Sequence, residues 1–393
     1  MPKPAVRFAM TAFLFLLTSS LPAQPVSEPH IAAGNGSSLF VDPDGHVRMW
    51  GILGFPQEQS AVIPQTVMTD AKAVFTTPSS AIFFVVKQDN SLWGWGFSRS
   101  GQLRMVRPFD EKTRGYVTPR KLMDRAVSAT AINITFALDP DGTLWVWGAG
   151  YDERGDGIRK MTLKPHKVLK NVAQFSSSMT HTLALKQDGT LWAWGFNPCG
   201  ALGTGDTKSH YKPVKIDLTP LGGRKIVRVA TRMTESFLVT DDGSVWNWGE
   251  PNNMKPYCMD EPRWVPVKLD TIDNVADIAV GYLHEVYLKK DGSVWVTGYT
   301  EGAASTSGGW KGPTKMMDGA AEIAAGEHHS LVLKKDGTLW AWGKNEFGQL
   351  GDGTTETRLE PVQVRFDLKP EDLPSLEKAT KPTPGFCEPL PIR

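Results

Sequence analysis

One sequence phrase recurs seven times along this chain and limits its fold more than any other feature. Each copy has a short apolar stretch, a turn that ends in Asp-Gly or a close variant, and a Trp-rich stretch that closes on Gly. The copy at 323–343 reads IAAGEHHSLVLKKDGTLWAWG. The closing glycines are Gly51, Gly96, Gly148, Gly195, Gly249, Gly298 and Gly343. Such loose spacing is typical of propellers and other repeat architectures.

Each copy has the pattern of a tight β-hairpin. The aliphatic run His329–Leu333 is typical of a strand buried on both faces. The pair Asp336-Gly337 then predicts a type I′ turn, because Asp-Gly accommodates positive φ angles. The stretch Leu339–Trp342 alternates, so its two tryptophans should point to one face and fill the wedge between neighbouring sheets. All tryptophans except Trp264 and Trp310 occupy such positions, so we expect them in the core rather than in a ligand site.

A longer variable connection follows each hairpin and often ends in a Pro-containing stretch, as at 212–216, 265–269 and 360–364. Proline suits an outer edge strand, where its missing N–H is not needed. The sequence therefore predicts an all-β fold: a seven-bladed β-propeller of four-stranded antiparallel blades over residues 31–366. We expect the ring to close by pairing of the terminal repeats, with the strand that ends at Val364 set against the first copy.

The two ends of the chain differ from the repeats. Lys3 and Arg7 precede the apolar run 8–17, and small residues follow, which predicts a signal peptide at 1–23. Residues 24–30 would be a short leader and 367–393 a Pro-rich tail. No other segment approaches the ~20 apolar residues of a membrane helix. We therefore expect an exported, periplasmic or extracellular protein without a transmembrane segment, and a monomer.

Charge and cysteine content narrow the function classes. Lys and Arg total 43 against 42 Asp and Glu, and loss of Lys3 and Arg7 leaves 41 against 42. Such a balance lacks the basic excess typical of nucleic-acid binding. The cysteines are Cys199, Cys258 and Cys387. A Cys199–Cys258 disulfide would suit an oxidising compartment if neighbouring blades bring these loops together, and three unpaired thiols are the alternative.

The sequence contains no recognised catalytic or cofactor motif. His181, His284 and His329 fall at one position of the repeat, which favours a hydrogen-bonding role at a strand start. Adjacent strand residues such as His328 and His329 point to opposite faces, so they do not predict a zinc site. No GxSxG elbow occurs, and the glycine-rich runs at 202–206 and 350–354 lack the Walker lysine. We therefore assign no catalytic residue, no metal ligand and no cofactor.

The chain resembles the regulator of chromosome condensation repeat family, most clearly in the segment 325–351, and the resemblance covers nearly all of it. The WD40 pattern is absent, because Gly follows the tryptophan. The resemblance implies a seven-bladed propeller whose partners dock on loops of one face. The loop before the histidine position gives Tyr282, Leu283 and His328, and the loop after Trp-Gly gives Arg99, Tyr151, Asp152, Glu346 and Phe347. These are the predicted partner-binding residues.

The leading hypothesis is an exported binder of an unidentified protein, a non-catalytic scaffold or interaction module. Nucleotide exchange on a nuclear GTPase, which the family resemblance would also imply, does not suit an exported protein. The basic stretch 99–125 suggests an alternative, a polysaccharide-binding or polysaccharide-degrading envelope protein. The chain is also similar to secreted type II β-lactamase inhibitor proteins, whose binding face is aromatic. No aromatic residue stands directly before the histidine position in any copy, which argues against that function.

Overall fold

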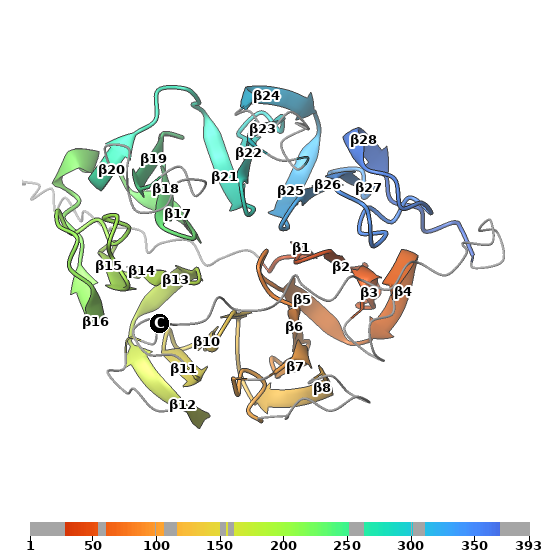
Figure 1. Ribbon diagram of the computed structural model, residues 1–393, viewed down its shortest axis with the longest axis horizontal. Helices are drawn as coiled ribbons and strands as arrows, with labels where there is room; N and C mark the ends of the chain where they lie inside the picture. The colour runs from red at the N-terminus through yellow and green to blue at the C-terminus, as the bar shows by residue number, and fades with distance from the viewer. Residues whose placement is uncertain are drawn as a thin grey trace, which may run out of the picture.

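Each repeat forms one four-stranded antiparallel sheet, and the seven sheets stand around a central axis as the blades of a propeller (Figure 1). This computed structural model describes residues 28–369 except 54–59, 99, 106–115, 150–154, 156–160, 251–262, 300 and 302–310. The predicted signal peptide and most of the predicted leader and tail lie outside this part. The predicted all-β, seven-bladed fold is confirmed.

The first four blades contain β1 (Ile31–Ala33), β2 (Ser37–Val41), β3 (Val47–Ile52) and β4 (Ser60–Met68); β5 (Ala71–Phe75), β6 (Ile82–Lys87), β7 (Leu92–Phe97) and β8 (Tyr116–Met123); β9 (Ser128–Ala131), β10 (Ile134–Leu138), β11 (Leu144–Gly148) and β12 (Thr162–Leu169); and β13 (Val172–Ser177), β14 (His181–Lys186), β15 (Leu191–Gly195) and β16 (His210–Lys215).

The last three blades contain β17 (Ile226–Arg232), β18 (Glu235–Thr240), β19 (Val245–Gly249) and β20 (Arg263–Lys268); β21 (Val275–Val280), β22 (His284–Lys289), β23 (Val294–Gly298) and β24 (Lys311–Met317); and β25 (Ala320–Ala325), β26 (His329–Lys334), β27 (Leu339–Gly343) and β28 (Arg358–Gln363). A short 3-10 helix, η1 (Thr219–Leu221), lies between blades 4 and 5. No helix in the described part of the chain is long and apolar enough to cross a membrane.

Strands follow one another in sequence order within every blade. Figure 1 shows the labelled first strands near the central axis and the fourth strands at the rim. The fourth strands β12, β16 and β20 carry a proline next to exposed lysine or apolar side chains. Proline and lysine protect edge strands from pairing with other chains, which agrees with the predicted outer position.

The hairpin turns differ from the prediction. In the last blade Lys334 N donates to Thr338 O and Gly337 N donates to Lys334 O, which defines a three-residue loop rather than a two-residue type I′ turn. Gly337 has a φ of 83°, whereas Asp336 is not among the residues with positive φ. Asp336 Oδ1 instead accepts a hydrogen bond from Thr338 N at 2.9 Å. The Asp-Gly pair thus fits a turn in which only the glycine is left-handed.

In every copy with two tryptophans except that of blade 5, where Trp246 and Trp248 are both buried, the two lie at different depths. The second one, for example Trp342, is fully buried against apolar residues of the two blades that it separates. The first one, for example Trp340, is half-buried and donates from its indole nitrogen to Thr338 Oγ1. Lys334 Nζ lies 5.8 Å from the Trp340 ring centre. Both rings are packing residues, but only the second fills the inter-blade wedge.

The ring closes between blades 7 and 1 by apolar packing and by hydrogen bonds, without a shared strand pair. The outermost strand β28 is hydrogen-bonded to β27 of its own blade, and β1 pairs with β2, so the described terminal repeats share no strand pair. Val364 and Phe366, which follow β28, instead pack against Phe40 and Trp50. The C-terminal strand region therefore helps to close the ring, as expected, but through apolar contacts and hydrogen bonds rather than through strand pairing.

Candidate functional site

One face of the propeller is formed by the loops that enter the second strand of each blade and those that leave the third. The ladder register brings these loops together, because His329 pairs with Gly343 and His284 with Gly298. Lys344 N also donates to His328 O at 2.9 Å. We call this surface the loop face. It carries all the predicted partner-binding residues that the structure describes.

Two of these residues, Tyr282 and His328, come together from neighbouring blades. Their ring centres are 5.9 Å apart, with an interplanar angle of 69°. The backbone holds them in this arrangement, because Tyr282 N donates to Glu327 O at 3.2 Å. Glu327 N in turn donates to Gly34 O of blade 1, also at 3.2 Å. The loops of blades 6, 7 and 1 are therefore continuous.

Phe347 extends this surface onto blade 1. Its ring covers Gly36, where an added Cβ would lie 2.8 Å from the ring, and Gly36 has a φ of 67°. A side chain at position 36 would therefore both strain the backbone and displace Phe347. Phe347 N donates to Gln349 Oε1 at 2.9 Å, which fixes the loop. We call Tyr282, Leu283, His328, Glu346 and Phe347 the loop-face strip.

Burial shifts the pKa values of two titratable groups beside the Tyr282 ring. It raises the pKa of Glu327, which Lys344 lowers in part. Burial also lowers the pKa of His328, and the charge of Lys344 lowers it further. The His328 imidazole is therefore neutral at neutral pH. Glu346 is exposed and pairs with Lys344 at 3.1 Å, so charge lies at the edge of the strip.

The remaining predicted contact residues, Arg99, Tyr151 and Asp152, lie outside the described residues. Two exposed side chains of the loop face were not predicted: Phe196 is 47% exposed and Met179 is 41% exposed. Phe196 N donates to Thr180 O at 2.8 Å, so both belong to the loops of blade 4. The sequence contained a signal for Phe196, because this residue comes directly after Trp194-Gly195 at the end of β15, where the loop that leaves the third strand begins.

The histidines of the repeat are structural, as predicted. His181 Nε2 lies 2.7 Å from Ser236 Oγ, His284 Nε2 lies 3.1 Å from Ser330 Oγ, and His329 Nε2 lies 2.9 Å from Ser38 Oγ. Each contact joins one blade to the next, and we call it a His–Ser latch. Ser38 donates its proton to Gln349 O, so the imidazole of His329 donates to Ser38. Burial lowers the pKa of His329 to about 3, which keeps this ring neutral.

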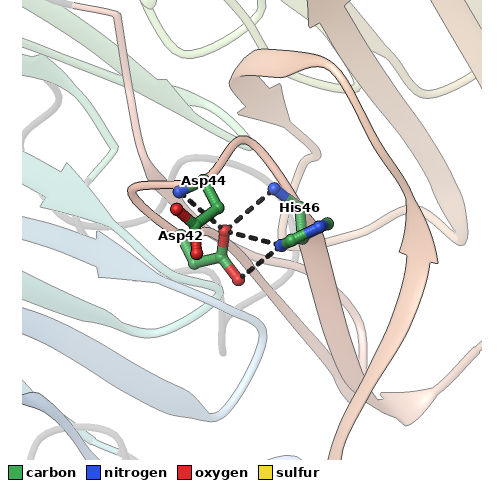
Figure 2. Close-up of side chains that lie close together, drawn as sticks. All are labelled: Asp42, Asp44 and His46. Atoms are coloured by element: carbon green, nitrogen blue, oxygen red, sulfur yellow. Dashed lines mark hydrogen bonds and ion pairs between the residues drawn. The ribbon is translucent and has the colours of Figure 1, made fainter.

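One group of residues has the composition of a cation site. Asp42, Asp44 and His46 in the hairpin turn of blade 1 place possible ligand atoms within 4.8 Å of one another (Figure 2). However, Asp42 Oδ1 accepts from the backbone N–H groups of Asp44 and His46, and Oδ2 accepts from Arg48 Nε at 2.9 Å. A cation would have to displace the guanidinium and break the turn. This arrangement fits a capped hairpin better than a metal site.

Cys199 is buried and disulfide-bonded. Its predicted partner, Cys258, lies outside the described residues, so this pairing stays a prediction.

Comparison with known proteins agrees with this architecture. The regulator of chromosome condensation (RCC1) repeat matches residues 172–201 and 320–349 in one family description and 188–231 and 336–372 in another. The ultraviolet-B receptor UVR8 of Arabidopsis thaliana is 29% identical over 235 residues, 57% of this chain. The match spans 53% of that receptor, about half of its length.

Solved structures show the same fold. A chain in the crystal structure of Kap60 bound to yeast RCC1 (Prp20) superposes with a TM-score of 0.69 at 18% identity, covering 93% of this chain and 90% of that one. Prp20p from Saccharomyces cerevisiae gives a TM-score of 0.66 at 19% identity, covering 83% and 87%. The chain therefore carries repeats of the regulator of chromosome condensation (RCC1) family, folded as an RCC1-like seven-bladed propeller.

Proposed function

We propose that this propeller is a non-catalytic protein-binding module that contacts its partner through the loop-face strip. The observation that carries the proposal is the continuity of the strip over blades 6, 7 and 1, with Tyr282 in edge-to-face contact with His328 and Phe347 packed on Gly36. Aromatic side chains are frequent anchors of protein interfaces, and interface centres are poor in charge. The neutral His328 and the position of Glu346 at the edge of the strip suit such a surface.

The similar propellers support a protein as the class of partner. One solved structure is described as Kap60 bound to yeast RCC1, and another reports the binding of Prp20p to Gsp1p and histones. Those partners belong to those proteins. For this chain they favour a protein ligand over a small molecule, because the proposed site is a surface of loops rather than an enclosed cleft.

Binding can be tested with a matched pair of variants. In the loop-face variant Tyr282 and His328 are replaced by Ala, which removes the edge-to-face ring pair. In the rim variant Trp264, which is 45% exposed on β20, is replaced by Ala. The protein from Gln24 onward is used as bait in secreted and envelope extracts, and retained proteins are identified and purified. We expect the loop-face variant to bind the partner with a dissociation constant at least tenfold higher than that of the parent, and the rim variant to bind it with the same constant as the parent.

Melting curves provide the control for folding, since both variants should unfold within a few degrees of the parent. Equal affinity of the parent and the loop-face variant would contradict the proposed face. Recovery of anionic polysaccharide, with no protein retained by any of the three forms, would contradict the protein-binding function itself.

We also propose that the protein is exported, on the basis of the basic start, the apolar run 8–17 and the small residues that follow. Expression of the full chain in a bacterium should then yield a periplasmic or secreted product whose first residue is Gln24. Mass spectrometry of the intact product measures this directly. A cytoplasmic product that retains residues 1–23 would show that the proposal is wrong.

A further inference from the structure

The junction between blades 5 and 6 replaces the His–Ser latch with charged residues. In the latches of blades 6 and 7, a glycine stands three residues before the histidine. A Cβ added to Gly281 would lie 2.2 Å from the His284 imidazole, and one added to Gly326 would lie 2.3 Å from that of His329. The corresponding residues of blade 5 are Arg232 and Glu235. Blade 6 then supplies Glu285 where blades 1, 5 and 7 supply the latch serine. The three exchanges are coupled, because an arginine side chain can occupy the glycine position only where the histidine is absent.

The three side chains form one buried ionic cluster. Arg232 Nη2 lies 2.5 Å from Glu235 Oε2, and Arg232 Nη1 lies 2.5 Å from Glu285 Oε1. Asn247 Nδ2 also donates to Glu235 Oε1 at 2.9 Å. Arg232, Glu235 and Glu285 expose only 7%, 2% and 7% of their surface. Glu235 thus has two partners in the cluster, whereas Glu285 has one.

This arrangement contains one permanent positive charge and two carboxyl groups. A buried group of this kind is neutral only when one carboxyl holds a proton, and burying an uncompensated charge is costly. Glu235 is the better stabilised carboxylate, because both Arg232 and Asn247 donate to it. We infer that Glu285 holds the proton, and that the blade 5–6 junction is a pH-sensitive latch which weakens when Glu285 ionises.

The surroundings of Glu285 agree with this assignment. The pKa of Glu285 is raised to about 7, and burial is the largest cause. The negative charge of Glu235 raises this pKa further, whereas the positive charge of Arg232 lowers it in part. Burial raises the pKa of Tyr287 well above its ordinary value and lowers that of His284 well below it, so both neighbours are neutral. The strand partners of Glu285, Val280 and Thr297, do not titrate. Glu285 is therefore the group of this cluster that changes charge near neutral pH.

The sign of the effect follows from proton binding. The folded state holds the proton up to about pH 7, whereas an exposed Glu loses it near its ordinary pKa of 4.5. Between these values the folded state binds more protons, so stability falls as pH rises. The full shift corresponds to about a 300-fold change in the unfolding equilibrium constant, complete above neutrality.

The test compares the parent with Glu285→Gln, which keeps an acceptor for Arg232 but cannot ionise. Urea unfolding of both proteins is measured from pH 5 to pH 8. We expect the unfolding constant of the parent to rise by about 70-fold relative to the variant over this range. A carboxyl-carbon NMR titration should place the pKa of Glu285 near 7. The inference would be overturned if the ratio of the unfolding constants of parent and variant were the same at pH 5 and pH 8, or if Glu285 titrated at or below pH 4.5.

A second variant covers the case in which Glu285→Gln does not fold. The triple exchange Arg232→Gly, Glu235→His and Glu285→Ser rebuilds the His–Ser latch of the next two junctions. This protein should not lose stability between pH 6.5 and pH 8 through this junction, because a buried neutral histidine is disfavoured by acid rather than by base. Unchanged loss of stability in the triple variant over that range would assign the pH dependence to another part of the molecule and refute the latch.

Discussion

A chain that ends after Phe347 is expected to lose the cooperative unfolding transition of the full protein, whereas a chain that ends after Lys369 should melt like the parent. The shorter chain lacks Gln349, whose carbonyl oxygen accepts hydrogen bonds from Trp50 Nε1 at 2.8 Å and from Ser38 Oγ at 2.7 Å. It also lacks β28 and the buried residues Leu350 and Val364. Blade 1 would then face solvent where it now contacts the segment 348–366.

The size of this effect follows from what is exposed. Each fully buried aliphatic side chain contributes about 1.5–3 kcal/mol, and each lost hydrogen bond costs about 1 kcal/mol. Two such side chains and the two bonds to Gln349 O already approach about 5 kcal/mol, the lower end of the stability of a typical domain. Loss of β28 and of the Phe366 contacts adds to this cost.

Thermal melting followed by circular dichroism measures the outcome, with tryptophan fluorescence as a second probe. The chain ending after Lys369 is the control, because it keeps every contact described between blades 7 and 1. Indistinguishable midpoints for the two shortened chains would contradict closure by the segment 348–366.

The repeat register explains why much of this structure could be predicted from sequence. Each residue of a repeat has counterparts at known positions, so the burial of Trp342 and the structural role of His329 followed from recurrence alone. The same register placed Tyr282 and His328 on one face. Their contact at 5.9 Å depends on the order of the blades around the ring, which consecutive repeats also supply.

Features outside the register could not be predicted in this way. Asp336-Gly337 fits both a two-residue and a three-residue hairpin loop, and the sequence does not state which carbonyl accepts the glycine N–H. Glu235 was visible as an exception at the histidine position. Its meaning required Arg232 and Glu285, which meet it from positions 3 and 50 residues away along the chain. A departure at one repeat position is therefore best interpreted together with the facing position of the next blade.

The unequal roles of the two tryptophans in a blade lead to the second large effect. Replacing Trp342 with Ala should destabilise the protein by about 3–5 kcal/mol, because it opens a cavity in the wedge between blades 6 and 7. Trp342 is fully buried there among Val286, Val296 and Ile323. The neighbouring strands cannot move together to fill this cavity, because the backbone hydrogen bonds within each blade hold them in place.

Trp340 provides the matched control two residues earlier on the same strand. Its ring is half-buried and makes one hydrogen bond to Thr338 Oγ1, at 3.0 Å, within its own hairpin. It is not part of the apolar cluster that holds Trp342, so Trp340→Ala should cost about 1–2 kcal/mol. Urea unfolding of both variants at one pH gives the comparison. Equal losses of stability would mean that the wedge does not depend on the second tryptophan, whereas a difference of about 2 kcal/mol or more would identify that residue as the main inter-blade packing element of the repeat.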